Sequence, residues 1–192
     1  TTRDGAPDVE QQMDVVREAH HAQVFRLLVQ DLEGLHTVER LSDYLSELAD
    51  RVLSIAIDHV WPLVRNRHRE RPRFAAIAYG RLGGKELGYA SDLDLVFVSD
   101  AAPQGVTDGE RSIDNTVFYT RLGQRIIHIM ETRMPLGQLY EVDMRLRPSG
   151  ESGMLVTTAK GFSSYQAESA WTWEHQALVR ARYVAGDAAV AG

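Results

Sequence analysis

Two aspartates stand one residue apart at the head of an apolar segment, at Asp92 and Asp94 of the run Ser91-Asp-Leu-Asp-Leu-Val-Phe-Val98. In an extended segment alternate side chains point to the same face, so both carboxylates are expected on one face and Leu93 on the other. Neighbouring carboxylates repel each other, and a divalent cation removes that repulsion. Oxygen ligands of this kind suit Mg²⁺. The spacing therefore predicts a magnesium site at the start of a strand.

A glycine pair, Gly83 and Gly84, precedes these aspartates and follows a short apolar run that is predicted to be a buried strand. Gly-Gly followed by Ser-Asp-x-Asp on a strand resembles the nucleotidyltransferase superfamily typified by DNA polymerase β. The resemblance implies that the glycine backbone approaches a triphosphate and that the aspartates hold metal ions that bridge its phosphates. A tight turn or an acidic strand start alone would be unremarkable, but their ordered combination favours a nucleotide site.

A second group of charged residues lies in Leu139-Tyr-Glu-Val-Asp-Met-Arg-Leu-Arg-Pro148, where polar and apolar side chains alternate. This period of two predicts a strand with Asp143, Arg145 and Arg147 on one face. A plain amphipathic edge strand would give the same pattern. Beside an Asp-x-Asp strand, however, Asp143 supplies a third metal ligand, and Glu141 lies on the same face one step further out. Arginine is suited to phosphate.

The bulk properties exclude several classes of protein. The 192 residues are 44% hydrophobic and 25% charged, which is typical of a soluble globular protein. The absence of cysteine excludes disulfides and thiolate metal sites, in keeping with the cytoplasm. A net charge of −6 argues against a protein that coats nucleic acid, and no apolar run is long enough for a membrane helix. We therefore expect neither nucleic acid nor a membrane as a partner.

The expected fold class is α+β, with a small mixed or antiparallel sheet flanked by helices. Residues 1–71 are predicted to form an N-terminal helical hairpin packed on a catalytic domain of residues 72–192. Adjacent His20 and His21 diverge on a helix and are assigned to the surface or to packing. The first predicted helix runs from Pro7 to Gly34, and the second runs from the N-cap Thr37 past a kink or restart at Pro62 to a basic end at 65–71. A helix at 112–133 is expected to hold Gly123 in close packing. The remaining predicted elements are strands at 74–79, 92–98, 139–147 and 154–158 and helices at 160–168 and 169–184.

Longer motifs make the resemblance more specific. Gly80-Arg-Leu-Gly-Gly-Lys-Glu-Leu-Gly88, the 139–150 segment, Gly153-Met-Leu-Val-Thr-Thr158 and Ala170-Trp-Thr-Trp-Glu-His-Gln-Ala-Leu-Val-Arg-Ala-Arg182 resemble the glutamine-synthetase adenylyltransferase family. The resemblance covers about residues 70–187 and implies a polymerase-β-like fold. That family carries two related halves, one that adds AMP to glutamine synthetase and one that removes it. Arg147-Pro-Ser-Gly150 and Trp171-Thr-Trp-Glu-His175 resemble the adding half.

The resemblance also implies roles for individual residues. Asp92, Asp94 and Asp143 match the family's metal-binding carboxylates. The match for the triphosphate cradle is Gly83, Gly84 and Ser91. Three cations have two interpretations each: Arg145 and Arg147 contact ATP phosphates or pair with carboxylates, and Lys85 contacts a phosphate or is a solvated lysine at a helix start. Trp171, Trp173 and Glu174 are expected to pack and to anchor a helix.

The implied reaction is the transfer of AMP from ATP to a tyrosine hydroxyl of glutamine synthetase, with two Mg²⁺ ions and release of pyrophosphate. Two alternatives stay open: phosphorolytic removal of AMP by the same kind of site, and a catalytically silent nucleotide-binding or regulatory module. The signalling protein PII is an expected partner only through the family's longer polypeptide. A weak response of this chain to glutamine and PII is expected, because nothing in the sequence indicates a second ligand pocket.

Overall fold

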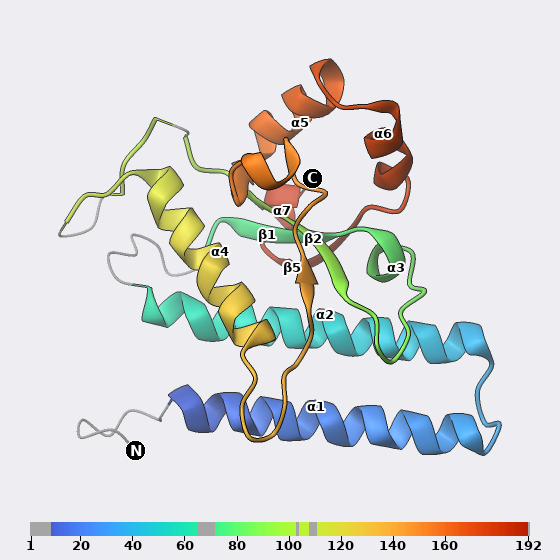
Figure 1. The fold of residues 1–192 in the computed structure, drawn as a ribbon. Helices are drawn as coiled ribbons and strands as arrows, with labels where there is room; N and C mark the ends of the chain where they lie inside the picture. The colour runs from blue at the N-terminus through green and yellow to red at the C-terminus, as the bar shows by residue number, and fades with distance from the viewer. Residues whose placement is uncertain (1–8, 65–71, 103, 108–110, 192) are drawn as a thin grey trace, which may run out of the picture.

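A five-stranded mixed sheet lies at the centre of the chain in the computed structural model, which describes residues 9–64, 72–102, 104–107 and 111–191 (Figure 1). The predicted basic helix end at 65–71 lies outside these residues. The path β3-β2-β1-β5 runs across the sheet, and β4 also pairs with β2. β1 is antiparallel to β2 and β5, whereas β2 is parallel to β3 and β4. The strands are β1 (Phe74–Ala78), β2 (Leu93–Ser99), β3 (Val142–Asp143), β4 (Val156–Thr158) and β5 (Arg182–Gly186).

Helices cover both faces of this sheet. The helices are α1 (Val9–Leu32), α2 (Val38–Leu63), α3 (Gly80–Gly83), α4 (Asn115–Glu131), α5 (Ala159–Glu168), α6 (Thr172–Leu178) and α7 (Ala188–Ala191), with a 3₁₀ turn at Gly150–Ser152. The mixed α+β class predicted from the sequence is confirmed. None of the helices within the described residues is long and apolar enough to span a membrane.

Alternation along β2 divides the core into two clusters. Leu93, Leu95 and Phe97 pack in the larger cluster, to which α2 and α4 contribute their apolar stripes. Val96 and Val98 face the other side, where the smaller cluster includes residues of α5, α6 and α7. Because Asp94 lies on the same side as Val96, its carboxylate points away from the larger core. The expected opposite orientation of Leu93 and Asp94 is confirmed.

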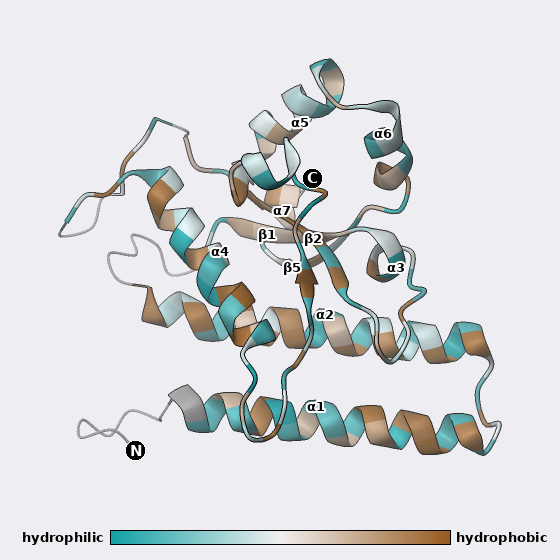
Figure 2. Cartoon of the chain, viewed as in Figure 1, coloured by the Kyte–Doolittle hydropathy of each residue, from teal (hydrophilic) through white to brown (hydrophobic). Residues whose placement is uncertain are grey.

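The N-terminal hairpin follows its sequence signals closely. Thr37 caps α2, since its hydroxyl accepts a hydrogen bond from the Arg40 N–H at 3.4 Å. Pro62 lies in the last turn, and the helix runs past it to Leu63. The stripe of α2 belongs to the same hydrophobic cluster as the sheet. By contrast, α1 leaves large apolar side chains exposed, such as Phe25 at 66% exposure, and brown, hydrophobic positions recur along the α1 ribbon in Figure 2.

Two predicted elements are wrong. The strand expected over 139–147 is limited to Val142–Asp143, because a turn follows in which the Arg147 N–H donates to the Met144 carbonyl at 3.2 Å. The helix expected over 169–184 ends at Leu178, and Arg182–Gly186 instead forms β5 against β1. Ala, Leu and Arg favour a helix locally, but pairing with an open sheet edge outweighs that propensity.

Two predictions about packing have opposite outcomes. A Cβ on Gly123 would lie 3.1 Å from a Val156 methyl and 3.2 Å from the Phe97 ring, so the expected close packing there is confirmed. The tryptophans do not pack: Trp171 is 71% exposed and Trp173 is 54% exposed. On a helix of only two turns, the side that faces the core is taken by a different residue, Glu174, so both indoles project outward.

Candidate active site

Three carboxylates lie near one another where β2 begins. Asp94 on β2 lies directly opposite Asp143 on β3 in the parallel register, and Asp92 immediately precedes β2. The pKa of Asp94 is raised, first by burial and then by the negative charges of Asp92 and Asp143. Each of the two neighbouring carboxylates is therefore close enough to repel that of Asp94. The tertiary structure thus brings together the three residues that the sequence proposed as a set.

Arg145 binds one of these carboxylates from the same loop. Its backbone N–H donates to Asp143 Oδ1 at 2.8 Å, its Nε donates to Oδ2 at 2.7 Å, and its Nη2 also contacts Oδ2. These hydrogen bonds, and then the guanidinium charge, lower the pKa of Asp143. Both oxygens of Asp143 are therefore engaged. This contact arises from the turn after β3 rather than from the strand alternation expected for Arg145.

The donor set fits a hard divalent cation. All three side chains offer carboxylate oxygens. Burial raises the pKa of Asp94 first and the negative charges of Asp92 and Asp143 raise it further, and a cation would relieve that charge repulsion. Within the described residues no three acidic, histidine or cysteine side chains are already gathered as a metal site. The residues that would hold such a cation are Asp92, Asp94 and Asp143, and in this structure Arg145 occupies both oxygens of Asp143.

An open hollow of about 760 Å³ adjoins these residues. Asp92, Asp143 and Arg145 line it, together with Glu131, Glu141 and Arg147. Glu141 is therefore at the site, as its strand position suggested. The Glu131 carboxylate accepts a hydrogen bond from the Val142 N–H at 3.1 Å and so braces β3 from the end of α4.

Arg147 is held by backbone carbonyl groups. It donates to the carbonyls of Met144 at 2.8 Å, Glu151 at 3.0 Å and Gly153 at 3.4 Å. Of the two roles expected for Arg147, phosphate binding or pairing with carboxylates, neither describes these contacts. They hold the turn that carries Arg145 in shape.

Gly80, at the start of α3, touches the site directly. Its φ is +53°, and a Cβ there would lie 2.1 Å from Asp94 Oδ2. Only glycine combines this backbone conformation with this close approach. Sequence reasoning missed Gly80, although its place between an apolar strand and a helical turn was a usable signal.

Arg81 is the second residue that sequence reasoning missed. Its positive charge lowers the pKa of Asp94, partly opposing the effect of burial. Its Nη1 also donates to Ser91 Oγ at 3.4 Å, and Ser91 Oγ accepts from the Gly88 N–H at 3.0 Å. Ser91 therefore closes the loop between α3 and β2, and Arg81 lies beside both that loop and the carboxylates.

The other predicted cradle residues lie elsewhere on the loop. Gly83 is buried, and a Cβ there would lie 2.0 Å from the Arg180 carbonyl oxygen and 2.8 Å from that of Ala78. Its small size is thus required by packing against the segment after α6. Gly84 and Lys85 are exposed next to it.

Glu174 holds the start of α6, and the segment after α6 packs against Gly83 of the α3 loop. It is 6% exposed and accepts hydrogen bonds from the Tyr165 hydroxyl at 2.9 Å and from the Trp171 N–H at 2.7 Å. The predicted anchoring role of Glu174 is therefore confirmed. The Arg180 guanidinium then pairs with Glu86 at 2.7 Å and ties the end of α6 to the α3 loop.

Comparison with known proteins identifies the family. The model of glutamate-ammonia ligase adenylyltransferases matches residues 3–191. The chain belongs to this family. It is 57% identical over 185 residues to a protein of Aromatoleum aromaticum, which covers 96% of this chain and 19% of that relative. A relative in Bordetella bronchiseptica is 52% identical over 184 residues, which is 96% of this chain and 19% of the relative.

The names of these relatives carry two activities. Both are called bifunctional glutamine synthetase adenylyltransferase/adenylyl-removing enzyme, as is a Chromobacterium violaceum protein that is 50% identical over 183 residues, 95% of this chain and 20% of the relative. This family member spans about a fifth of the length of the curated relatives it matches. In those relatives, the region that corresponds to this chain is therefore one segment of a much longer polypeptide.

Proposed function

We propose that this chain transfers AMP from ATP to a tyrosine hydroxyl of glutamine synthetase and releases pyrophosphate. The observation that carries the proposal is the β2–β3 register, in which Asp143 lies opposite Asp94, while Asp92 lines the same hollow as Asp143. Such a trio is what a polymerase-β-like nucleotidyltransferase site needs, and the mixed sheet is compatible with that fold. Membership of the adenylyltransferase family supports the choice of AMP as the transferred group.

Two Mg²⁺ ions held by Asp92, Asp94 and Asp143 would supply Lewis-acid neutralisation of the phosphates. The tyrosine oxygen forms a bond to the α-phosphorus of ATP. The bond from that phosphorus to the oxygen that bridges it to the β-phosphorus breaks, so pyrophosphate leaves, and the proton of the tyrosine hydroxyl passes to Asp143. Release of Arg145 prepares this step, because its hydrogen bonds are what lower the pKa of Asp143.

The cations near the trio are assigned to the triphosphate. Arg145 is exposed and moves from Asp143 to a phosphate, which offers the same charge-assisted hydrogen bonds. Arg81 projects from the α3 turn and neutralises the leaving pyrophosphate, and Gly80 lets the backbone approach the triphosphate. The loop that passes around the triphosphate is shaped by Gly83, Gly84, Ser91 and Lys85.

Asn variants test the trio directly. The chain is incubated with glutamine synthetase, Mg²⁺ and ATP, and the intact mass of glutamine synthetase is measured. One AMP unit should be added, and Asp92→Asn, Asp94→Asn and Asp143→Asn should each abolish the addition. Asp58→Asn, an exposed aspartate of α2, is the matched control and should act like the parent. Near-normal rates in any two of the three site variants would reject the assignment.

The second candidate function is the reverse process, phosphorolytic removal of AMP. The relatives' names favour it as much as addition, since they contain both activities. A carboxylate site of this kind can serve both reactions, because both pass through the same kind of in-line transition state at the phosphorus of the AMP group, with pyrophosphate leaving in addition and inorganic phosphate attacking in removal. Release of ADP from adenylylated glutamine synthetase in inorganic phosphate, without any ATP-dependent addition, would assign the chain to removal. Retention of both activities by the longer polypeptide carrying Asp94→Asn, with neither activity shown by this chain, would leave the chain a nucleotide-binding module.

PII is proposed as a partner of the longer polypeptide rather than of this segment. The part of the chain that the structure describes contains the site and its supporting helices, and the relatives carry roughly four-fifths of their length elsewhere. We therefore expect transfer by this chain to be insensitive to added PII. Titration of PII into the mass assay measures this directly.

A further inference from the structure

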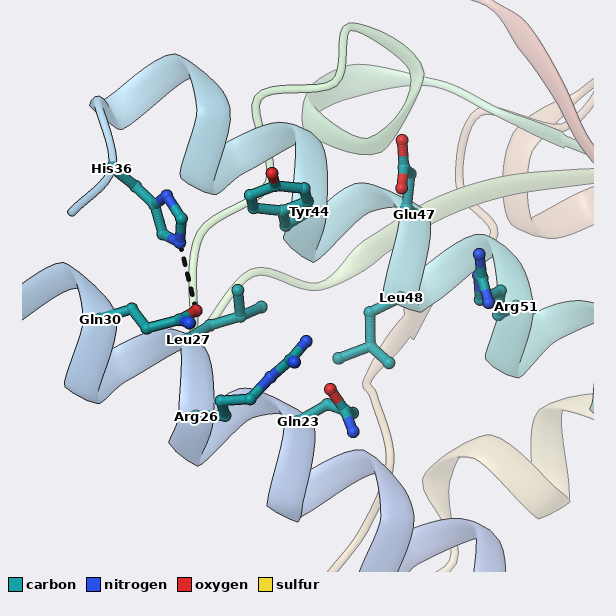
Figure 3. A pocket seen from close by; sticks show the side chains of 9 residues that line it. All are labelled: Gln23, Arg26, Leu27, Gln30, His36, Tyr44, Glu47, Leu48 and Arg51. Carbon is teal, nitrogen blue, oxygen red and sulfur yellow. Dashed lines mark hydrogen bonds between the residues drawn. The ribbon is translucent and has the colours of Figure 1, made fainter.

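A second hollow lies between α1 and α2, near the turn that joins them, and has a volume of about 420 Å³ (Figure 3). None of the residues that line it also lines the hollow beside the carboxylates. Its volume lies within the roughly 300–1,000 Å³ usual for small-molecule sites. No pattern in the sequence indicated a second ligand pocket, because the residues that form it come from two separate helices.

The base of this hairpin pocket is apolar. Leu27 of α1 is buried and Leu48 of α2 is half-buried, and Figure 3 shows Leu48 pointing down from α2 towards α1. Tyr44 adds an aromatic wall, and the Gln30 side chain is fixed by a 3.2 Å hydrogen bond to His36 Nε2. A ligand in this pocket would therefore cover apolar surface as well as meet polar groups.

Two arginines line the pocket from opposite helices. Arg26 extends from α1 into the space between the helices, and Arg51 lies on α2 (Figure 3). Among the residues that the structure describes, neither has an ion-pair or hydrogen-bond partner, whereas Arg40 on the same helix as Arg51 donates to the Tyr44 hydroxyl at 3.2 Å. Glu47 is the single acidic residue of the lining, so the two arginines leave the pocket with a net positive charge although the whole chain carries −6.

We propose that the hairpin pocket binds a small organic anion. Arg26 and Arg51 hold its carboxylate or phosphate, since guanidinium groups present several donors to such oxygens. Its apolar part lies against Leu27 and Leu48. An inorganic anion would meet the arginines but leave this apolar base in water, so an organic body adds affinity.

Ligand titrations followed by NMR of the isotope-labelled 192-residue chain test the proposal. The probes are 3-phenylpropionate, hexanoate and glutarate, with 3-phenylpropionamide as the uncharged match and inorganic phosphate as the match without an apolar body. At least one carboxylate should shift the Arg26 and Leu48 signals at millimolar concentration. The amide and inorganic phosphate should each bind about tenfold more weakly, one for lack of charge and the other for lack of apolar surface.

Variants then locate the binding. Arg26→Gln and Arg51→Gln should each weaken it about tenfold, and Arg121→Gln, an exposed arginine of α4, should leave it unchanged. The proposal is overturned if none of the three carboxylates shifts these signals, if the amide or inorganic phosphate binds as well, or if the two pocket variants bind like Arg121→Gln. Adenylyl transfer is not used as a readout, so this result is independent of the proposed function.

Discussion

Replacement of Gly80 by alanine tests whether the α3 turn must approach Asp94. The new Cβ would lie 2.1 Å from Asp94 Oδ2, so the carboxylate must move by about 1 Å or more to reach a normal contact distance. A misplacement of about 1 Å at a reacting centre costs on the order of 100-fold in rate. The positive φ of +53° adds about 1–2 kcal/mol of backbone strain to the folded state.

Gly34→Ala separates the two effects. Gly34 also has a positive φ, +69°, but a Cβ there would meet no atom within 4 Å. Its alanine variant should therefore lose about 1–2 kcal/mol in the free energy of unfolding and keep full transfer activity. Urea unfolding and the mass assay on glutamine synthetase measure both quantities for both variants.

The transfer rates and unfolding free energies of Gly80→Ala and Gly34→Ala together decide whether the reasoning holds. If Gly80→Ala transfers AMP within threefold of Gly34→Ala, then Asp94 is not needed where the structure places it. If Gly80→Ala loses transfer but its unfolding free energy falls no further than that of Gly34→Ala, the loss arises at the site and the reasoning stands.

Three further outcomes follow from buried ionisable groups. Asp94→Asn should raise the melting temperature of the metal-free protein, because burial and neighbouring negative charges disfavour the ionised form; a lower melting temperature would contradict this. Glu174→Ala should lower the free energy of unfolding by about 2 kcal/mol, as two donors lose their acceptor, and Tyr165→Phe by about half as much. Burial, and then the charge of His21, lower the pKa of His20 to about 4. As the pH falls below about 6.5, His20 therefore binds a proton in the unfolded chain but stays neutral in the folded chain. Stability should thus fall by about 2 kcal/mol from pH 7 to pH 5 in chemical denaturation, and His20→Gln, but not His21→Gln, should remove most of that fall.

Local pattern alone determined several parts of this protein. The alternation after Ser91 predicted that Asp92 and Asp94 would share a face, and Asp94 indeed lies on the side opposite Leu93 and Leu95. The Thr37 cap and the apolar stripe predicted α2. These features depend on residues a few positions apart, whose geometry is set by the regular repeat of a helix or a strand.

Tertiary structure alone decided which distant residues meet. Asp143 became a neighbour of Asp94 through parallel pairing of a two-residue strand, and Arg145 turned back onto Asp143 because the chain leaves β3 in a turn held by Arg147. Gly80 owes its importance to the position of Asp94 across the loop. β5 formed where local propensity favoured a helix, because an unpaired edge of β1 offered backbone hydrogen bonds that no short sequence window contains.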